Sequence, residues 1–194
     1  MNEIATYPSL KDKTVIVTGG ASGIGATIVE HFLQQDCKVA FLDKENELGN
    51  KLSEKLDHYK YKPVFKYCDL KNIKLLRKSI EEISDELGSI SILVNNAAND
   101  ERHHIDDVTE EFWDERMHIN LRHYFFATQS VYKDMKKLGK GAVVNIGSFS
   151  WMLGQGNMPA YTTAKSAVMG LTRTIARDLG KYNIRVNSVI PGWI

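Results

Sequence analysis

The stretch from Thr14 to Gly25, TVIVTGGASGIG, decides the fold. It starts with a β-branched run, Thr14–Thr18, which is typical of a buried parallel strand, and continues into a glycine-rich turn. Glycine permits a positive φ and lets the backbone approach a ligand closely. A helix is expected directly after the turn, and its free N–H groups and partial positive charge favour a pyrophosphate. A glycine-rich turn that binds no ligand is the alternative.

The rest of the chain alternates in the same way. Strands are expected at 38–42, 63–67, 90–94, 142–146 and 184–190, and helices at 24–35, 45–56, 73–87, about 109–138 and 161–179. Helices of ten or more residues between strands imply right-handed βαβ units and a parallel sheet. We therefore predict an α/β fold, a doubly wound Rossmann-type sheet of six strands in a single domain over residues 1–194. Such sheets bind ligands outside the carboxyl ends of their strands.

Composition excludes several classes of protein. The 194 residues are 43% hydrophobic and 25% charged, which is ordinary for a globular domain. A net charge of +1 gives no basic excess for a nucleic acid. No apolar run is long enough to span a membrane, and residues 1–13 do not resemble a secretory signal. Two cysteines, Cys37 and Cys68, make no disulfide framework, so we expect a cytoplasmic protein.

Two carboxylates follow the carboxyl ends of predicted strands, where such sheets bind ligands. Asp43 comes 18 residues after Gly25, where an acidic side chain can accept hydrogen bonds from an adenosine ribose. It would repel a 2′-phosphate, which favours NAD over NADP, although Lys44 could offset that repulsion. Asp69, after the third strand, could bind the adenine edge. The alternative for both is a solvated loop carboxylate.

Tyr161 and Lys165 are four residues apart near the start of a predicted helix, so both side chains lie on one face. A tyrosine, with an ordinary pKa near 10, is a poor base at neutral pH. At about 5 Å a lysine ammonium would favour the phenolate by roughly 3 kcal/mol, which would lower the pKa of the phenol by about 2. An exposed tyrosine beside a surface lysine is the alternative.

Other polar residues gather at the same edge. Ser148 follows the fifth strand, 13 residues before Tyr161, and the run Asn95-Asn96-Ala97-Ala98 ends the fourth strand. Asn120 lies inside the long helix, where asparagine is a poor helix former, which indicates a partner for its amide.

Taken together, these motifs resemble the short-chain dehydrogenase/reductase family in order and spacing, from Leu10 to the last residue. The matching segments are Thr18–Gly25, Asp69, Asn95–Ala97, Asn120, Ser148, Tyr161–Lys165 and Pro191-Gly192. The resemblance implies that Tyr161 is the general acid/base, that Lys165 lowers its pKa and binds the nicotinamide ribose, and that Ser148 orients the reacting group. It implies that Asn120 holds a water in the proton relay. The implied cofactor-binding set is Gly19, Ser22, Gly23, Ile24, Gly25, Asp43, Asp69, Leu70, Asn96, Ala97, Tyr161, Lys165, Pro191, Gly192 and Ile194.

Several segments are similar to bacterial sugar dehydrogenases of this family that act on pentoses. They are 96–103, 113–116, 120–123 and 149–151. The implied substrate residues are Asn99, Asp100, Arg102, His103, Ser148, Trp151, Asn157 and Tyr161, which would surround the sugar with hydrogen-bonding groups and one flat apolar wall. A polar surface loop is the alternative. No metal is expected at His103-His104, because adjacent histidines point apart and no third ligand is placed nearby.

These features predict an NAD-dependent oxidoreductase that oxidises the C1 hydroxyl of a cyclic aldose to the lactone. The alternatives are an NAD(P)-dependent carbonyl reductase or secondary-alcohol dehydrogenase with another substrate, and a nucleotide-binding protein without catalysis on the same fold. The expected partners are a small molecule and further copies of the chain, in a dimer or tetramer; no nucleic acid or membrane is expected. Family members usually continue past the Pro191-Gly192 turn with a substrate-covering segment and a seventh strand. We therefore expect a C-terminally incomplete chain whose sixth strand is an exposed edge.

Overall fold

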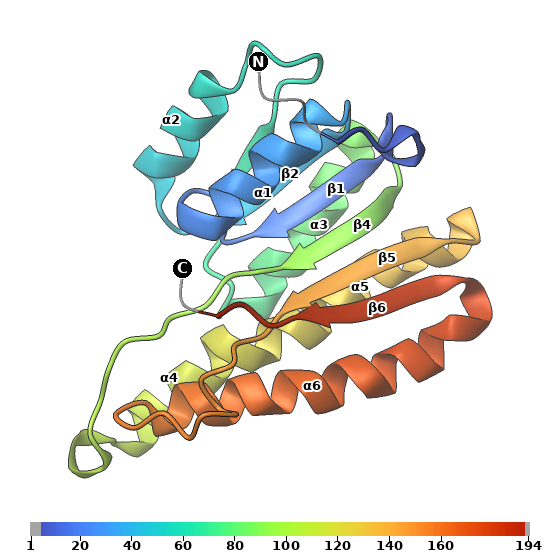
Figure 1. The fold of residues 1–194 in the computed structure, drawn as a ribbon. Helices are drawn as coiled ribbons and strands as arrows, with labels where there is room; N and C mark the ends of the chain where they lie inside the picture. The colour runs from blue at the N-terminus through green and yellow to red at the C-terminus, as the bar shows by residue number, and fades with distance from the viewer. Residues whose placement is uncertain (1–4, 193–194) are drawn as a thin grey trace.

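The computed structural model describes residues 5–192, and their centre is one parallel six-stranded sheet (Figure 1). The strands are β1 (Thr14–Thr18), β2 (Lys38–Asp43), β3 (Val64–Tyr67), β4 (Ile90–Asn95), β5 (Gly141–Ile146) and β6 (Ile184–Val189). Their order across the sheet is β3-β2-β1-β4-β5-β6, with every pair parallel. The prediction of a doubly wound parallel sheet is confirmed, and β6 lies at one edge of the sheet.

Helices cover both faces of the sheet because alternate strand residues point to opposite sides. They are α1 (Gly23–Gln34), α2 (Asn46–Lys55), α3 (Ile73–Leu87), α4 (Glu110–Met117), α5 (His123–Leu138) and α6 (Pro159–Leu179). One apolar core joins Val15 and Val17 to Val29 and Leu33 of α1. The other joins Ile16 and the opposite strand faces to α3, α5 and α6. These two cores fix α1 and α6, the helices that begin at the binding edge.

The long helix predicted at about 109–138 is interrupted in the structure. Thr109 caps its start by accepting a hydrogen bond from the backbone N–H of Phe112. A π-helical turn, His118–Arg122, separates α4 from α5, and Asn120 lies inside it. A π-turn is rare and is found mostly at functional sites. Asn120, for whose amide the sequence predicts a partner, therefore lies at a helix irregularity of this kind.

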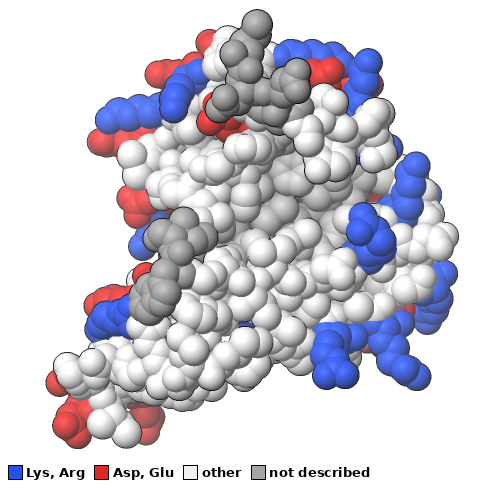
Figure 2. All heavy atoms as spheres, viewed as in Figure 1, with Lys and Arg blue, Asp and Glu red and all other residues white. Residues whose placement is uncertain are grey.

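The strand order reverses direction between β1 and β4, which is where such sheets bind ligands. The loops that follow β1, β4 and β5 all open at this edge (Figure 1). On the face seen in Figure 2, charged side chains lie mainly around the rim and the centre is uncharged. Among residues 5–192 no helix is both long and apolar enough to cross a bilayer. Cys37 and Cys68 are buried and free.

Candidate active site

The glycine turn after β1 is shaped to receive a ligand at the start of α1. Gly19 has a φ of 65°, and a Cβ added there would lie 2.7 Å from the Ala97 Cα. Gly23 has a φ of 51° and faces open space, which leaves its backbone accessible. Ser22 makes no side-chain capping bond to α1. The first N–H groups of α1 are therefore free of a side-chain cap, as a helix N-terminus that holds a pyrophosphate requires.

Asn96 ties the loop after β4 to this turn. Its amide donates to the backbone carbonyls of Thr18, at 3.1 Å, and Gly19, at 3.0 Å. The Thr18 hydroxyl in turn accepts from the backbone N–H groups of Asn96 and Ala97. The loops after β1 and β4 are thus one hydrogen-bonded unit. Asn96 holds the glycine turn in place, in addition to the cofactor-binding role expected for it.

A cavity of about 540 Å³ opens above this unit. Its lining includes Gly19, Ser22, Gly23, Ile24, Gly25, Asp43, Asp69, Leu70, Asn96 and Ala97. The Asp43 carboxylate accepts hydrogen bonds from the backbone N–H groups of Ala21, at 3.0 Å, and Glu45, at 3.1 Å. Asp69 accepts one from the backbone N–H of Lys71. The structure therefore brings together ten of the residues predicted to bind the cofactor, and it fits the adenosine and pyrophosphate of a dinucleotide.

A second cavity, of about 260 Å³, shares Ile24, Asn96, Ala98 and Asp100 with the first. Its walls hold Ser148, Phe149, Gln155, Met158, Tyr161, Lys165, Pro191 and Gly192. Three of the four predicted catalytic residues and the Pro191-Gly192 turn thus meet beside the cofactor cavity. The remaining predicted cofactor residue, Ile194, lies outside the described residues.

The electrostatics of Tyr161 and Lys165 differ from the sequence-based expectation. Burial raises the pKa of Tyr161 above its ordinary value, and a hydrogen bond with Ser148 opposes that rise. Burial also lowers the pKa of Lys165 to about 7. The Lys165 Nζ lies 5.7 Å from the centre of the Tyr161 ring and is hydrogen-bonded elsewhere, to the Tyr124 hydroxyl and the Ile146 carbonyl. The sequence-based expectation that Lys165 lowers the pKa of Tyr161 is therefore wrong for the chain without cofactor, in which the pKa is raised.

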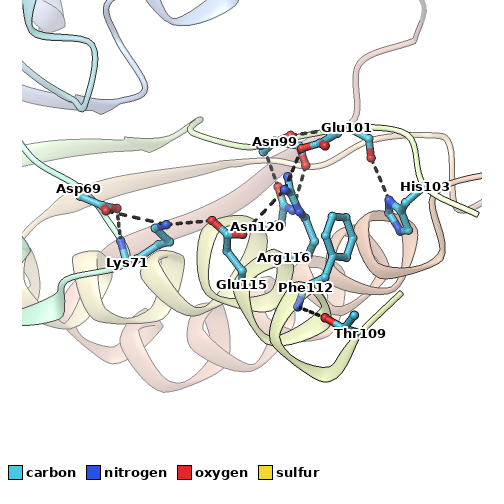
Figure 3. Close-up of polar contacts among 10 residues, drawn as sticks. All are labelled: Asp69, Lys71, Asn99, Glu101, His103, Thr109, Phe112, Glu115, Arg116 and Asn120. Carbon is cyan, nitrogen blue, oxygen red and sulfur yellow. Dashed lines mark hydrogen bonds and ion pairs between the residues drawn. The ribbon is translucent and has the colours of Figure 1, made fainter. Parts of the chain in front are cut away.

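Asn120 holds the loop after β4 (Figure 3). Its side chain is fully buried, its amide donates to the Asn99 carbonyl at 3.0 Å, and its amide oxygen accepts from the Asn99 N–H at 2.8 Å. The π-turn carries Asn120 to a point where both halves of the amide meet this backbone. The water-holding role implied by the family resemblance stays a prediction.

The residues predicted to contact a sugar are divided by the structure. Asp100, Arg102, Ser148 and Tyr161 line the second cavity. Asn99, His103, Trp151 and Asn157 are not among its lining residues. The Asn99 side chain accepts a hydrogen bond from the Glu101 N–H, and Asn157 is exposed with a φ of 61°. Trp151 lies against α6 in a separate shallow pocket with Thr162, Thr163 and Ser166.

Both ring nitrogens of His103 bond backbone groups in this structure, so they are not available to a sugar. Its ring is buried, and its Nε2 accepts a hydrogen bond from the Ala160 N–H at the start of α6. Its Nδ1 therefore carries the ring hydrogen and donates to the Glu101 carbonyl, at 2.9 Å. The backbone N–H of His103 also donates to the Asn157 carbonyl. These bonds join the loop after β4 to the helix that carries Tyr161.

A charged network that the sequence did not reveal runs along α4 (Figure 3). Arg116 is buried, pairs with Glu101 at 2.8 Å and stacks on the Phe112 ring. Next to it on α4, Glu115 pairs with Lys71, which follows Asp69 of the cofactor cavity, at 2.8 Å. No spacing rule links Arg116 to Glu101 or Glu115 to Lys71, because each ion pair joins two separate segments. The network holds both cavities' loops against α4.

Among the described residues, no cluster of three or more His, Cys, Asp or Glu side chains is arranged to hold a metal ion. The site instead combines a dinucleotide cradle with a half-buried serine, a half-buried tyrosine and a buried lysine. This combination defines the class of nicotinamide-dependent oxidoreductases.

Comparison with known proteins gives the family. The model of the short chain dehydrogenase family matches residues 13–194, and the chain belongs to this family. It is an oxidoreductase that acts on CH–OH groups with a nicotinamide cofactor. It is 48% identical over 188 residues to a D-xylose 1-dehydrogenase of Caulobacter vibrioides (strain NA1000 / CB15N), covering 97% of this chain and 74% of the relative.

Two further comparisons agree. The chain is 45% identical over 189 residues to a protein of Rhizobium meliloti (strain 1021) named "Probable galactose dehydrogenase GalD", covering 97% of this chain and 74% of the relative. It is similar to a crystal structure, from Sinorhizobium meliloti 1021, of a protein described as a short-chain alcohol dehydrogenase. The TM-score is 0.91 at 28% identity, over 95% of this chain and 73% of the other.

Proposed function

We propose that this protein oxidises the C1 hydroxyl of a cyclic pentose or hexose to the lactone, with NAD as the hydride acceptor. The observation that carries the proposal is the cavity in which Ser148, Tyr161 and Lys165 meet, which shares walls with the dinucleotide cavity. The sugar follows from the relatives: the proteins named for D-xylose and galactose are 48% and 45% identical to the chain.

The residues of the chain divide the chemistry between them. When it is bound, the nicotinamide accepts a hydride from the carbon that carries the reacting hydroxyl. The deprotonated Tyr161 oxygen takes the proton of that hydroxyl, and the carbon–oxygen bond becomes double. Ser148, hydrogen-bonded to Tyr161, orients the reacting oxygen. Lys165 has three N–H groups and uses two on Tyr124 and Ile146, so one remains for the cofactor ribose.

The walls of the second cavity suit a polyol. Asp100 and Arg102 offer an acceptor and a donor for sugar hydroxyls, and Gln155 offers both. Phe149 and Met158 provide apolar surface beside them. A ring with one apolar face and several hydroxyls matches this mixture.

A substrate panel on the full-length protein tests the proposal. With NAD, we expect the absorbance of reduced cofactor to rise with D-xylose or D-galactose. The second candidate, a secondary-alcohol dehydrogenase or carbonyl reductase, would instead turn over cyclic alcohols or ketones and leave the sugars unchanged. Binding of NAD without turnover of any member of the panel would favour a nucleotide-binding protein. A relative named cyclopentanol dehydrogenase, 35% identical, gives the second candidate its support.

Asp43 is expected to set the choice between NAD and NADP. Replacement by asparagine keeps an oxygen that can accept the Ala21 N–H but removes the charge that repels a 2′-phosphate. We expect Asp43→Asn to lower the preference for NAD over NADP, as a ratio of kcat/KM values, by about tenfold (about 1.4 kcal/mol). The control is Glu54→Gln, which removes an exposed carboxylate of α2 that lines neither cavity. A wild-type enzyme that prefers NADP, or a ratio unchanged in Asp43→Asn, contradicts this assignment.

Assembly into a dimer or tetramer and a cytoplasmic location stay predictions.

A further inference from the structure

Tyr124, which follows the π-turn at the start of α5, makes a closed set of hydrogen bonds with the proposed catalytic lysine. Its hydroxyl accepts from the Lys165 Nζ at 2.9 Å and donates to the Ile146 carbonyl at 2.9 Å. Lys165 donates to the same carbonyl at 2.8 Å. Tyr124 is 0% exposed and Lys165 is 1% exposed, so water cannot substitute readily for any of these partners.

A buried ammonium needs acceptors, because its desolvation is costly. Among the described residues no carboxylate forms an ion pair with Lys165, and every salt bridge involves a different lysine or arginine. Its acceptors are two neutral oxygens, a carbonyl at the end of β5 and the Tyr124 hydroxyl. The hydroxyl is thus half of the hydrogen bonding that favours the charged form of the lysine against its burial.

The same contacts decide where the lysine points. A lysine side chain has four rotatable bonds, whereas a tyrosine ring places its oxygen rigidly. Tyr124 is held by the carbonyl at the end of β5 and by the ring packing of His123, 4.6 Å away. With the Tyr124 oxygen and the Ile146 carbonyl occupying two N–H groups, only one N–H is left for the cavity.

Resting on the proposed roles of Tyr161 and Lys165, we propose that Tyr124 is a positioning residue of this active site, whose hydroxyl favours the ammonium form of Lys165 and aims it at the cofactor ribose. Tyr124 does not itself exchange protons with substrate. Burial raises the pKa of its phenol far above the ordinary value, so it stays a neutral hydroxyl at any working pH.

The charged and titratable groups around Lys165 come from three segments. Tyr161 faces it from α6, Asp100 from the loop after β4, and His123 and Tyr124 from α5. His123 stays neutral because burial lowers its pKa to about 3. Changes in a pH profile between about 5 and 10 on removal of the Tyr124 hydroxyl therefore report on the Lys165–Tyr161 pair.

The test is Tyr124→Phe in the full-length protein, which removes one oxygen and keeps the ring. We expect kcat to fall by 10- to 100-fold, the sugar KM to stay within twofold, and the dissociation constant of NAD, measured by calorimetry without sugar, to rise several-fold. The acid limb of the pH–rate profile should move to higher pH, because a less firmly charged Lys165 favours the Tyr161 phenolate less. Tyr59→Phe, which also removes a hydroxyl that bonds two side chains but far from the cavity, should change none of these.

A double-mutant cycle with Lys165→Met separates positioning from packing. If Tyr124 acts through the lysine, Tyr124→Phe should change NAD affinity and kcat in the wild-type background but not in Lys165→Met. Equal effects in both backgrounds, or a Tyr124→Phe enzyme with an unchanged pH profile and kcat, would overturn the proposal and leave the proposed function intact. The proposed function fails separately, if Tyr161→Phe and Lys165→Met both keep full activity. Thermal denaturation of each variant shows whether it is folded when these constants are measured.

Discussion

Replacement of Tyr161 by phenylalanine is expected to lower kcat/KM for the sugar by about 10³-fold, a loss of roughly 4 kcal/mol of transition-state stabilisation. The change removes the oxygen that takes the substrate proton and leaves the ring in the wall of the cavity that Ser148 and Lys165 also line. NAD affinity should fall by less than fivefold, because the cradle after β1 is untouched. The measurement is initial-rate kinetics on the full-length protein together with calorimetry for NAD.

The pH dependence of the wild-type enzyme belongs to the same prediction. Oxidation needs the deprotonated Tyr161, and burial raises the pKa of that phenol in the chain alone. The rate of oxidation should therefore climb with pH, by up to tenfold per pH unit, until the phenol has titrated. Tyr59→Phe should keep the wild-type profile. A Tyr161→Phe enzyme with the wild-type rate would remove the tyrosine from the mechanism.

The parts of the fold that the sequence predicted are those encoded locally. Strand β1, the glycine turn and α1 are consecutive, so β-branched residues, glycines and helical spacing describe all three. The six strands follow from the same alternation, because short strands separated by helices leave few topologies. Ser148 and Tyr161 were predicted at the same end of the sheet for the same reason: Ser148 follows β5 directly, and Tyr161 lies at the start of the next helix.

The contacts that were missed join segments far apart in the chain. His103 looks like a polar loop residue, yet its partner is the Ala160 N–H, 57 residues later. Tyr124 has only the pattern of a core residue on a helix, and nothing near it in the sequence indicates a lysine 41 residues away. Whether a polar side chain contacts a ligand or the backbone depends on such packing, which spacing alone does not specify.

The glycine turn gives the second large expected effect. A Cβ added at Gly25 would collide with the Gly19 carbonyl and lie 2.7 Å from the Asn96 amide nitrogen. Backbone cannot move aside as a flexible side chain does, so Gly25→Ala must push the start of α1 away from the glycine turn after β1. We expect NAD affinity to fall by at least 100-fold, and the free energy of unfolding to fall by about 1–3 kcal/mol from overpacking.

Gly180→Ala is the matched control for this substitution. Gly180 has a φ of −54°, which alanine adopts without strain, and an added Cβ would meet nothing within 4 Å. Its NAD affinity and stability should equal or slightly exceed those of the wild type. Calorimetry with NAD alone and thermal denaturation distinguish the two positions. If Gly25→Ala binds NAD within twofold of the wild type, the close approach of α1 to the glycine turn is not what holds the pyrophosphate, and the pyrophosphate has to be assigned elsewhere at the carboxyl ends of the strands.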